Sequence, residues 1–453
     1  MKFIAKMLLL LFPFFLMGKS IATNCDEYLI QAEKNWHFSG SVLIVKKGKI
    51  LLSKGYGHAI FEHSIANNES TIFRMASLTK PITATAILYL CEKGYLDLNT
   101  PISYYLPNFS KRMGKKITIH HLLTHTSGLP DYLDYANLEW KRINHSPEEL
   151  LKSIRNKTLL FRPGTQVKQS HTNYILLGAI IEAVTEKTYD DFLEDTFFTP
   201  LKMFASGYND ERLPLPKKAI GYAHNEKGKL ICAPFEDLSI HYSSAGLYTC
   251  VEDLYLWDKA LEEEKLISKK SMQKAWTPHA GHYGYGWSIQ EKFSKKMATH
   301  TGAINGFVAT YIKFFDDGLT VIILSNNEKS PTKIIAESLA AIAFGFPYEL
   351  PTKRQTVMLP SSQYQKYIGQ YMRGDKNEIK IYTNKDRLFL LLDNKKKQEL
   401  FPLTAQGNDF YCKDKLDLKI TFHQDSLGEA NFLVIYENNQ EFIFKKNFED
   451  ATI

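Results

Sequence analysis

Two hairpin patterns that lie far apart in the chain constrain its fold more than any other feature. Residues 39–57 alternate apolar and polar positions on either side of Lys47-Gly48, and residues 307–325 form two apolar runs around Asp316-Asp317-Gly318. Strand-like runs joined by a short turn containing glycine are typical of an antiparallel hairpin. We expect the early and late strands to share one antiparallel sheet, with helices packed on it.

The chain between these hairpins has a different pattern, with helical periods and loops. Residues 147–155, 174–185 and 251–264 are examples of predicted helices. Residues 364–446 show short strands separated by turn signals, as in a small all-β barrel-like module. The predicted fold class is therefore α/β (α+β), with an antiparallel sheet flanked by helices, a helical insertion lobe and a small all-β C-terminal domain.

The first 22 residues resemble an export signal. Lys2 and Lys6 lie beside an apolar run over 7–17, and small residues precede position 23. The run is too short to span a bilayer, so we expect cleavage rather than an anchor. We predict a signal peptide over 1–22, a main domain over 23–348 and a β-rich domain over 349–453. The mature protein is expected in the periplasm or medium, without a stable membrane span.

Charge and cysteine content exclude some classes of function. The net charge of +7 includes three lysines and no acids in the predicted signal, so the mature chain carries +4. So mild a charge argues against a dedicated nucleic-acid surface. The five cysteines lack metal-ligand spacing. Cys232 and Cys250 could pair in an oxidising compartment. We predict no metal and no cofactor.

The tetrad Ser77-Leu78-Thr79-Lys80 suggests a nucleophile beside its base. A serine hydroxyl is a poor nucleophile at neutral pH and needs a neighbouring base. Side chains three residues apart on a helix share a face, so Lys80 can stand beside the Ser77 hydroxyl. The apolar stretch 82–91 predicts a buried helix whose positive dipole end would lie at Ser77. Such a tetrad is common on ordinary helix surfaces, so it needs further support.

That support comes from three more blocks, at residues 117–130, 162–178 and 300–307. They contain Leu-Leu-Thr-His-Thr-Ser-Gly-Leu-Pro, then Pro-Gly-Thr followed by Tyr-Ile-Leu-Leu-Gly, and then His-Thr-Gly. With the serine tetrad they resemble, in order, the penicillin-recognising serine hydrolases, in the branch of class C β-lactamases, D,D-peptidases and related esterases. The resemblance covers about residues 38–346. The β-rich tail is similar to modules appended to exported members of this branch.

The resemblance implies a role for each matching position. Ser77 matches the nucleophile that forms an acyl-enzyme, and Lys80 matches its partner. His300-Thr301-Gly302 matches the third motif, on the strand that edges the active site. The oxyanion hole would consist of the backbone N–H of Ser77 and a backbone N–H of that strand. Donors aimed at developing charge usually contribute much of such catalysis.

One block departs from the family pattern. Members of this branch have Tyr-x-Asn where this chain has Gln169-Ser170-His171, and matching residues on both sides fix the register. The family's tyrosine takes part in proton transfer, which glutamine cannot do because it has no titratable proton. Two consequences compete. Either Lys80, alone or helped by His171, supports turnover in an atypical hydrolase, or the chain is a binding or sensor relative with weakened catalysis.

The third motif bears on the substrate. β-Lactamases of this branch usually carry lysine at the position of His300, where the cation anchors a carboxylate. A mostly neutral histidine anchors it less well and occurs in esterase-like and peptidase-like relatives. The resemblance therefore implies an exported hydrolase that forms an acyl-enzyme on Ser77. An esterase or peptidase, acting on a cell-wall-type or small acyl substrate, is favoured over a dedicated β-lactamase.

Other enzyme classes have weaker support in the sequence. His121 and His125 lie four residues apart and could share a helix face as zinc ligands, but the glutamate of a zinc-protease helix is missing. The chain has no Gly-x-Ser-x-Gly elbow and no phosphate-binding loop. A structural role for His125 is favoured over zinc binding.

Overall fold

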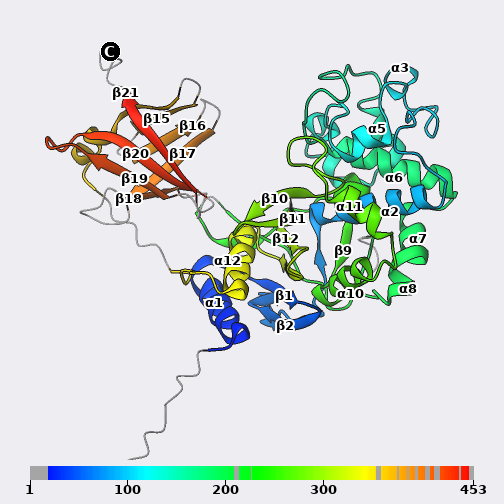
Figure 1. Cartoon of the computed structure of the whole chain (residues 1–453), viewed down its shortest axis with the longest axis horizontal. Helices are drawn as coiled ribbons and strands as arrows, with labels where there is room; N and C mark the ends of the chain where they lie inside the picture. The colour runs from blue at the N-terminus through cyan, green and yellow to red at the C-terminus, as the bar shows by residue number, and fades with distance from the viewer. Residues whose placement is uncertain are drawn as a thin grey trace, which may run out of the picture. The chain divides into compact units, whose positions relative to one another are not determined.

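The structure is a computed structural model with two compact units, one up to Pro351 and one from Thr352 (Figure 1). It describes residues 19–208, 214–225, 227–352, 359–374, 377–384, 387–392, 396–402, 409–412, 419–437 and 440–447. Most of the predicted signal peptide, residues 1–18, lies outside the described residues. The predicted domain boundary after residue 348 stays a prediction, because a compact unit need not fold independently.

The first unit is built on a six-stranded antiparallel sheet, as the two hairpins predicted. Its order is β10 (Ser288–Lys292), β11 (Lys295–Ile304), β12 (Phe307–Phe314), β13 (Leu319–Ser325), β1 (Gly40–Lys46) and β2 (Lys49–Tyr56). The early strand β1 pairs with the late strand β13, with Val42 opposite Ile323. This pairing joins two segments that lie near the two ends of the unit's sequence, with most of its residues between them.

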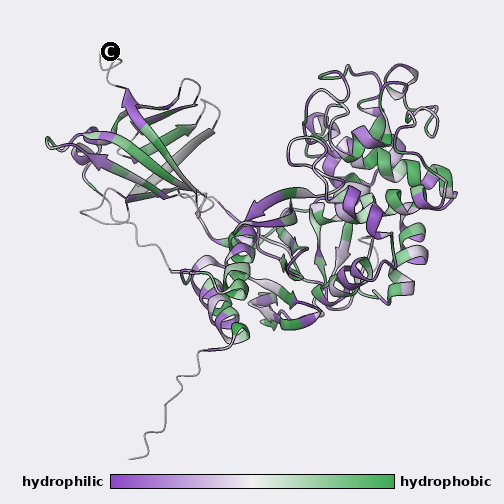
Figure 2. Ribbon diagram, viewed as in Figure 1, coloured by the Kyte–Doolittle hydropathy of each residue, from purple (hydrophilic) through white to green (hydrophobic). Residues whose placement is uncertain are grey.

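Both faces of the sheet are covered, which explains why β1 and β13 are buried at almost every position and carry apolar residues in their central positions. Val42 packs in the cluster formed with α1 (Ile21–Trp36) and α12 (Thr332–Phe344), while Leu43 packs in the cluster of the helical lobe. Successive side chains of a strand point to opposite faces. Complete burial of one such side chain is worth about 1.5–3 kcal/mol. Figure 2 shows the hydrophobic residues concentrated on these strands and on α12.

The chain between the hairpins forms the predicted helical lobe. Its helices are α2 (Thr79–Glu92), α3 (Lys111–Gly114), α4 (Ile119–Leu123), α5 (Pro147–Lys152), α6 (His171–Thr185), α7 (Tyr189–Leu193), α8 (Thr199–Leu201), α9 (Tyr242–Ala245), α10 (Val251–Glu262) and α11 (Lys269–Ala275). Short strand pairs lie among them: β5 (Phe73–Arg74) and β6 (Gly207–Tyr208) flank β9 (Leu247–Thr249), β3 (His58–Ile60) pairs with β4 (Ile65–Ala66), and β7 (Tyr222–His224) with β8 (Leu230–Cys232). Among all the described residues, no helix is both long enough and apolar enough to cross a bilayer.

Two sequence predictions in this lobe need correction. Helix α6 begins at His171, three residues before the predicted start, because the carboxylate of Asp131 accepts the His171 backbone N–H and so satisfies the first turn. The pairing considered for Cys232 and Cys250 does not form. Cys232 is an exposed thiol in β8, whereas Cys250 is buried and caps α10 with its sulfur.

The second unit is a closed antiparallel barrel, which confirms the predicted β-rich C-terminal region. Its strands are β14 (Gly369–Arg373), β15 (Asn377–Asn384), β16 (Arg387–Leu392), β17 (Lys396–Pro402), β18 (Asp409–Cys412), β19 (Lys419–Gln424), β20 (Ala430–Glu437) and β21 (Gln440–Asn447). Strand β14 also pairs with β21, which closes the barrel. Tyr367, Tyr371, Phe410 and Phe422 are buried in its core and contact one another through their rings.

Candidate active site

Ser77 lies in a short 3-10 turn, η1 (Ala76–Leu78), directly before α2. Ala76 has a φ of 50°, a left-handed conformation that costs energy for a residue with a side chain. Strand β11 passes close behind this turn. A Cβ added at Gly302 would lie 2.6 Å from the Ser77 nitrogen and 2.9 Å from the Ala76 Cβ. Only glycine fits there, so Gly302 brings β11 against the backbone of the serine.

Lys80 stands beside Ser77 on the first turn of α2. Its Nζ lies 2.9 Å from the Ser77 Oγ and donates to the Ser244 carbonyl at 3.0 Å. The side chain is buried, and burial lowers the lysine pKa to about 7, against a smaller opposing effect of the Asp131 charge. A large fraction of Lys80 is therefore a neutral amine at neutral pH, the form that accepts a proton.

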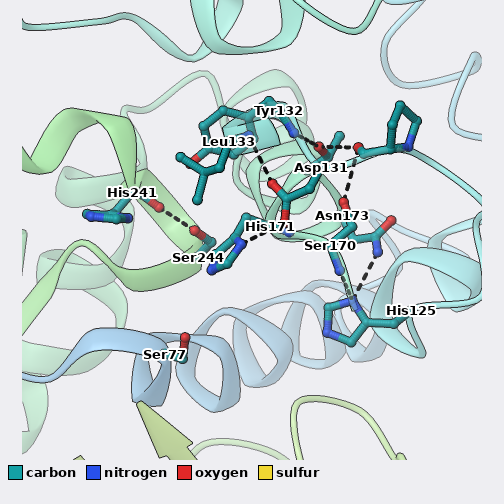
Figure 3. A network of polar contacts seen from close by, with 12 residues as sticks. Ser77, His125, Asp131, Tyr132, Leu133, Ser170, His171, Asn173, His241 and Ser244 are labelled. Carbon is teal, nitrogen blue, oxygen red and sulfur yellow. Dashed lines mark hydrogen bonds and ion pairs between the residues drawn. The ribbon is translucent and has the colours of Figure 1, made fainter. Parts of the chain in front are cut away.

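His171, the first residue of α6, is held by a carboxylate that the sequence analysis did not identify. Its Nδ1 lies 2.8 Å from Asp131 Oδ2, and its backbone N–H donates to the same oxygen at 3.0 Å. Figure 3 shows the imidazole of His171 between Asp131 and the side of the site where the Ser77 hydroxyl points. Gln169 is exposed at the edge of the pocket.

His300 is buried on β11 and carries no charge at neutral pH. Burial, with a smaller contribution from the Lys80 charge, lowers the pKa of its imidazole to about 3. Its Nε2 lies 3.3 Å from the hydroxyl of Tyr283, and its Nδ1 lies 2.8 Å from the Thr301 carbonyl oxygen. The position that holds a lysine in β-lactamases of the resembling branch is thus occupied by a neutral ring.

The two histidines considered as zinc ligands have separate structural roles. His121 is part of a capping box at the start of α4, where its Nδ1 accepts from the Thr118 backbone N–H. The Nδ1 of His125 accepts from the Asn173 side-chain amide at 3.0 Å and from the Ser170 backbone N–H at 3.4 Å. His125 therefore ties the loop before α6 to the loop after α4, and it lines the pocket rather than holding a metal with His121.

One pocket gathers the predicted site residues from three parts of the chain. It is lined by Ser77, Lys80, Gln169, His171, His300 and Thr301, together with groups that include Asp131, His125 and Tyr283. Gly302 lies behind the serine. The residues missed were Asp131, Ser244 and Tyr283. Only Asp131 had a sequence signal, since it directly follows the block that ends at Pro130.

A serine beside a buried lysine and a glycine-containing edge strand is the arrangement found in hydrolases that work through an acylated serine. Comparison with known proteins gives the particular family. Residues 29–343 match the family described as Beta-lactamase, and residues 353–450 match a domain of unknown function (DUF3471). The chain belongs to the Beta-lactamase family and is a serine hydrolase of the penicillin-binding-protein type.

Individual relatives extend this result over nearly the whole chain. Penicillin-binding protein 4* of Bacillus subtilis is 28% identical over 431 residues, which cover 89% of this chain and 94% of the relative. The structure of the octameric penicillin-binding protein homologue from Pyrococcus abyssi matches with a TM-score of 0.68 at 23% identity, over 93% of this chain and 99% of the homologue. The penicillin-binding protein from Bacillus halodurans matches with a TM-score of 0.61 at 28% identity, over 70% of this chain and all of that chain.

Proposed function

We propose that the protein cleaves an ester or peptide by transferring the acyl group to Ser77. The contact of 2.9 Å between Lys80 Nζ and Ser77 Oγ carries the proposal. Lys80 takes the hydroxyl proton as Oγ attacks the substrate carbonyl carbon, and the Ser77 N–H with a backbone N–H of β11 stabilises the oxyanion. The lysine then returns the proton to the leaving group. A pKa of about 7 suits it to both transfers.

The electrostatics of the pocket support an ester or peptide substrate over a dedicated β-lactamase function. A permanent cation on β11 would anchor a substrate carboxylate, but His300 is a buried neutral ring. Lys80 is fully engaged with Ser77 and the Ser244 carbonyl. Strand β11 therefore has weak means of holding a substrate carboxylate, and a further lysine of the pocket lining, Lys333, lies on α12 instead. A cell-wall-type or small acyl group suits this strand better.

Export to the periplasm or medium is part of the proposal. The predicted cleavage after Ala22 falls in the first turn of α1, and every buried residue of that helix follows it: Cys25, Tyr28, Leu29 and Ala32. Removal of residues 1–22 would therefore leave the apolar contacts of α1 in place. Amino-terminal sequencing of protein recovered from the periplasm or medium tests this, and an intact Met1 there would contradict it.

The activity is tested by intact mass and by turnover. We expect a chromogenic short-chain ester to be hydrolysed faster than a chromogenic penicillin, and a transient acyl adduct to map to Ser77. The Ser77→Ala variant should give neither adduct nor turnover. Undiminished turnover by this variant would refute the proposal. A stable adduct of the native protein without turnover would favour the sensor alternative.

A further inference from the structure

The pair formed by Asp131 and His171 has the geometry of a proton-transfer device. Asp131 caps the 3-10 turn η2 (Tyr132–Tyr135), and three N–H groups hold its carboxylate. Oδ1 accepts from the Leu133 backbone at 3.1 Å, while Oδ2 accepts from the backbone and the ring of His171 at 3.0 Å and 2.8 Å. The carboxylate is therefore fixed by two segments that lie 40 residues apart in the chain.

The hydrogen bond to Asp131 selects the tautomer of the imidazole. Burial acts to raise the Asp131 pKa, but the hydrogen bonds from His171 and Leu133 outweigh it, so the pKa lies below its usual value and the group is ionised at neutral pH. An ionised carboxylate only accepts hydrogen bonds, so the proton of neutral His171 resides on Nδ1. The lone pair of Nε2 then faces the pocket, on the side of Ser77 (Figure 3).

The charges around His171 keep this lone pair available. Burial and the Lys80 charge lower the imidazole pKa, and the opposing effect of Asp131 is smaller. His241 also lowers it. The ring is thus neutral at neutral pH, when a base is needed. Gln169, at the position of the family's tyrosine, has no proton to exchange.

We propose that His171 is the general base of deacylation and that Asp131 is its positioning residue. This inference rests on the proposed acyl-enzyme at Ser77. Nε2 removes a proton from a water molecule as the water oxygen bonds to the acyl carbonyl carbon, whose π electrons move to the carbonyl oxygen. The tetrahedral intermediate then collapses, the bond from carbon to Ser77 Oγ breaks, and the proton on Nε2 passes to Oγ. The products are the carboxylic acid and free Ser77.

The positions of the two bases assign one step to each. Lys80 Nζ is hydrogen-bonded to the serine oxygen itself and to the Ser244 carbonyl, the arrangement for removing the serine proton. His171 reaches the site from α6, across the pocket, and is one-third exposed in its side chain. In this proposal, the hydrolytic water enters from this exposed side. A base there meets the incoming water, whereas Lys80 lies beneath the acylated oxygen.

Separate measurement of acylation and deacylation tests the assignment on the full-length protein. With a chromogenic ester we expect His171→Ala to slow deacylation by about 10²–10⁴-fold, the scale of a positioned base, and to change acylation by less than about tenfold. An acyl adduct on Ser77 should accumulate. Added imidazole should restore part of the deacylation rate. Asp131→Asn should slow deacylation too, because its amide can donate to Nδ1 and favour the other tautomer.

Controls make the outcomes distinct. His171→Asn keeps the backbone bond to Asp131 but cannot act as a base, so it replaces His171→Ala if that variant fails to fold. His63→Ala, at an exposed position outside the pocket, should be unaffected by imidazole. The inference is wrong if His171→Ala deacylates at the native rate, if it loses acylation equally, or if the native adduct itself persists. Each of these three results would refute the role of His171 but not that of Ser77 as nucleophile. Turnover by Ser77→Ala would instead refute the acyl-enzyme on Ser77, and the role of His171 would then be refuted as well.

Discussion

Two buried lysines of the first unit show how the partners of a buried amine set its pKa. Lys80 lies in the pocket next to a serine and a carbonyl, whereas Lys313 lies under α10, with its Nζ 2.7 Å from both Asp258 and Glu262. Burial favours the neutral amine in both places. Two adjacent carboxylates reverse this for Lys313, whose pKa is raised, while the pKa of Lys80 falls to about 7.

A buried lysine alone is therefore not enough to identify a catalytic site. The ion cluster around Lys313 is internally satisfied, because Tyr311 and Thr320 also donate to Asp258. The hydrogen-bond partners of Lys80 are instead neutral, and no carboxylate is bonded to it, so its proton can leave. The barrel offers a third case: among its described residues, every buried side chain is hydrophobic.

Substitution of Lys80 should produce the largest effect. We expect Lys80→Met to slow acylation of Ser77 by about 10³-fold, because the serine loses its base. Stability should change little, since removal of a buried amine offsets the lost hydrogen bond to Ser244. Rapid-quench mass spectrometry and thermal denaturation measure the two quantities. Acylation at the native rate would mean that another group activates the serine.

Substitution of Lys313 should affect stability instead of activity. Lys313→Met leaves Asp258 buried without its cation, which typically costs about 3–5 kcal/mol. The acylation rate of the folded fraction should not change. As a matched control, Lys313→Met combined with Asp258→Leu replaces both charges with apolar groups and should recover most of the loss. Chemical denaturation gives the free energies, and a loss below about 1 kcal/mol would show that the cluster is not a buried ion pair in energetic terms.

The sequence predicted the position of Lys80 beside Ser77, but it did not predict the contacts that form across long stretches of the chain, including those of Lys313. Ser77 and Lys80 are three residues apart at a helix start, so local geometry alone brings them together. The alternating strands of the first hairpin and the two apolar runs of the second were equally local signals. By contrast, Lys80 meets Ser244 across 164 positions, and His171 meets Asp131 across 40. Such contacts depend on loop paths that no local pattern specifies, and the same limit applies to the cysteines that do not pair.

The pH dependence sharpens the comparison between the lysines. Acylation should increase as pH rises through about 7, because Lys80 must be neutral to accept the proton. Asp131, His125, His171 and His300 surround it, and the pKa of each lies below its usual value, whereas the pKa of Lys80 is about 7. Pre-steady-state acylation rates across pH 5–9 measure this midpoint. A midpoint below 6 would assign the base to a histidine.

The pH dependence of the folding stability gives an independent test of the lowered pKa of Lys80. The pKa of Lys80 is about 7 in the folded protein and 10.5 in an unfolded chain, so the unfolded chain binds more protons between these pH values. Stability therefore rises with pH across this window. Lys80→Met should remove that slope. The raised pKa of Lys313 has the opposite sign, and its contribution is complete below pH 10.5 and lost only above its folded pKa. Equal slopes in the native protein and the variant would contradict the lowered pKa.

The smallest effect is expected from Thr320→Val, which trims the Lys313 cluster without removing a charge. The Thr320 hydroxyl donates to Asp258 Oδ2 at 2.9 Å and is itself within 3.2 Å of Lys313 Nζ. Valine keeps the shape but not the hydroxyl, so Asp258 loses one donor while Tyr311 and Lys313 remain. The loss of one hydrogen bond to a charged group costs about 1.5–3 kcal/mol, less than the loss of the cation. Chemical denaturation should give this loss with an unchanged acylation rate. A loss as large as that of Lys313→Met would mean that hydrogen bonds rather than charge pairing hold the cluster, and the contrast between the two lysines would then need a different physical basis.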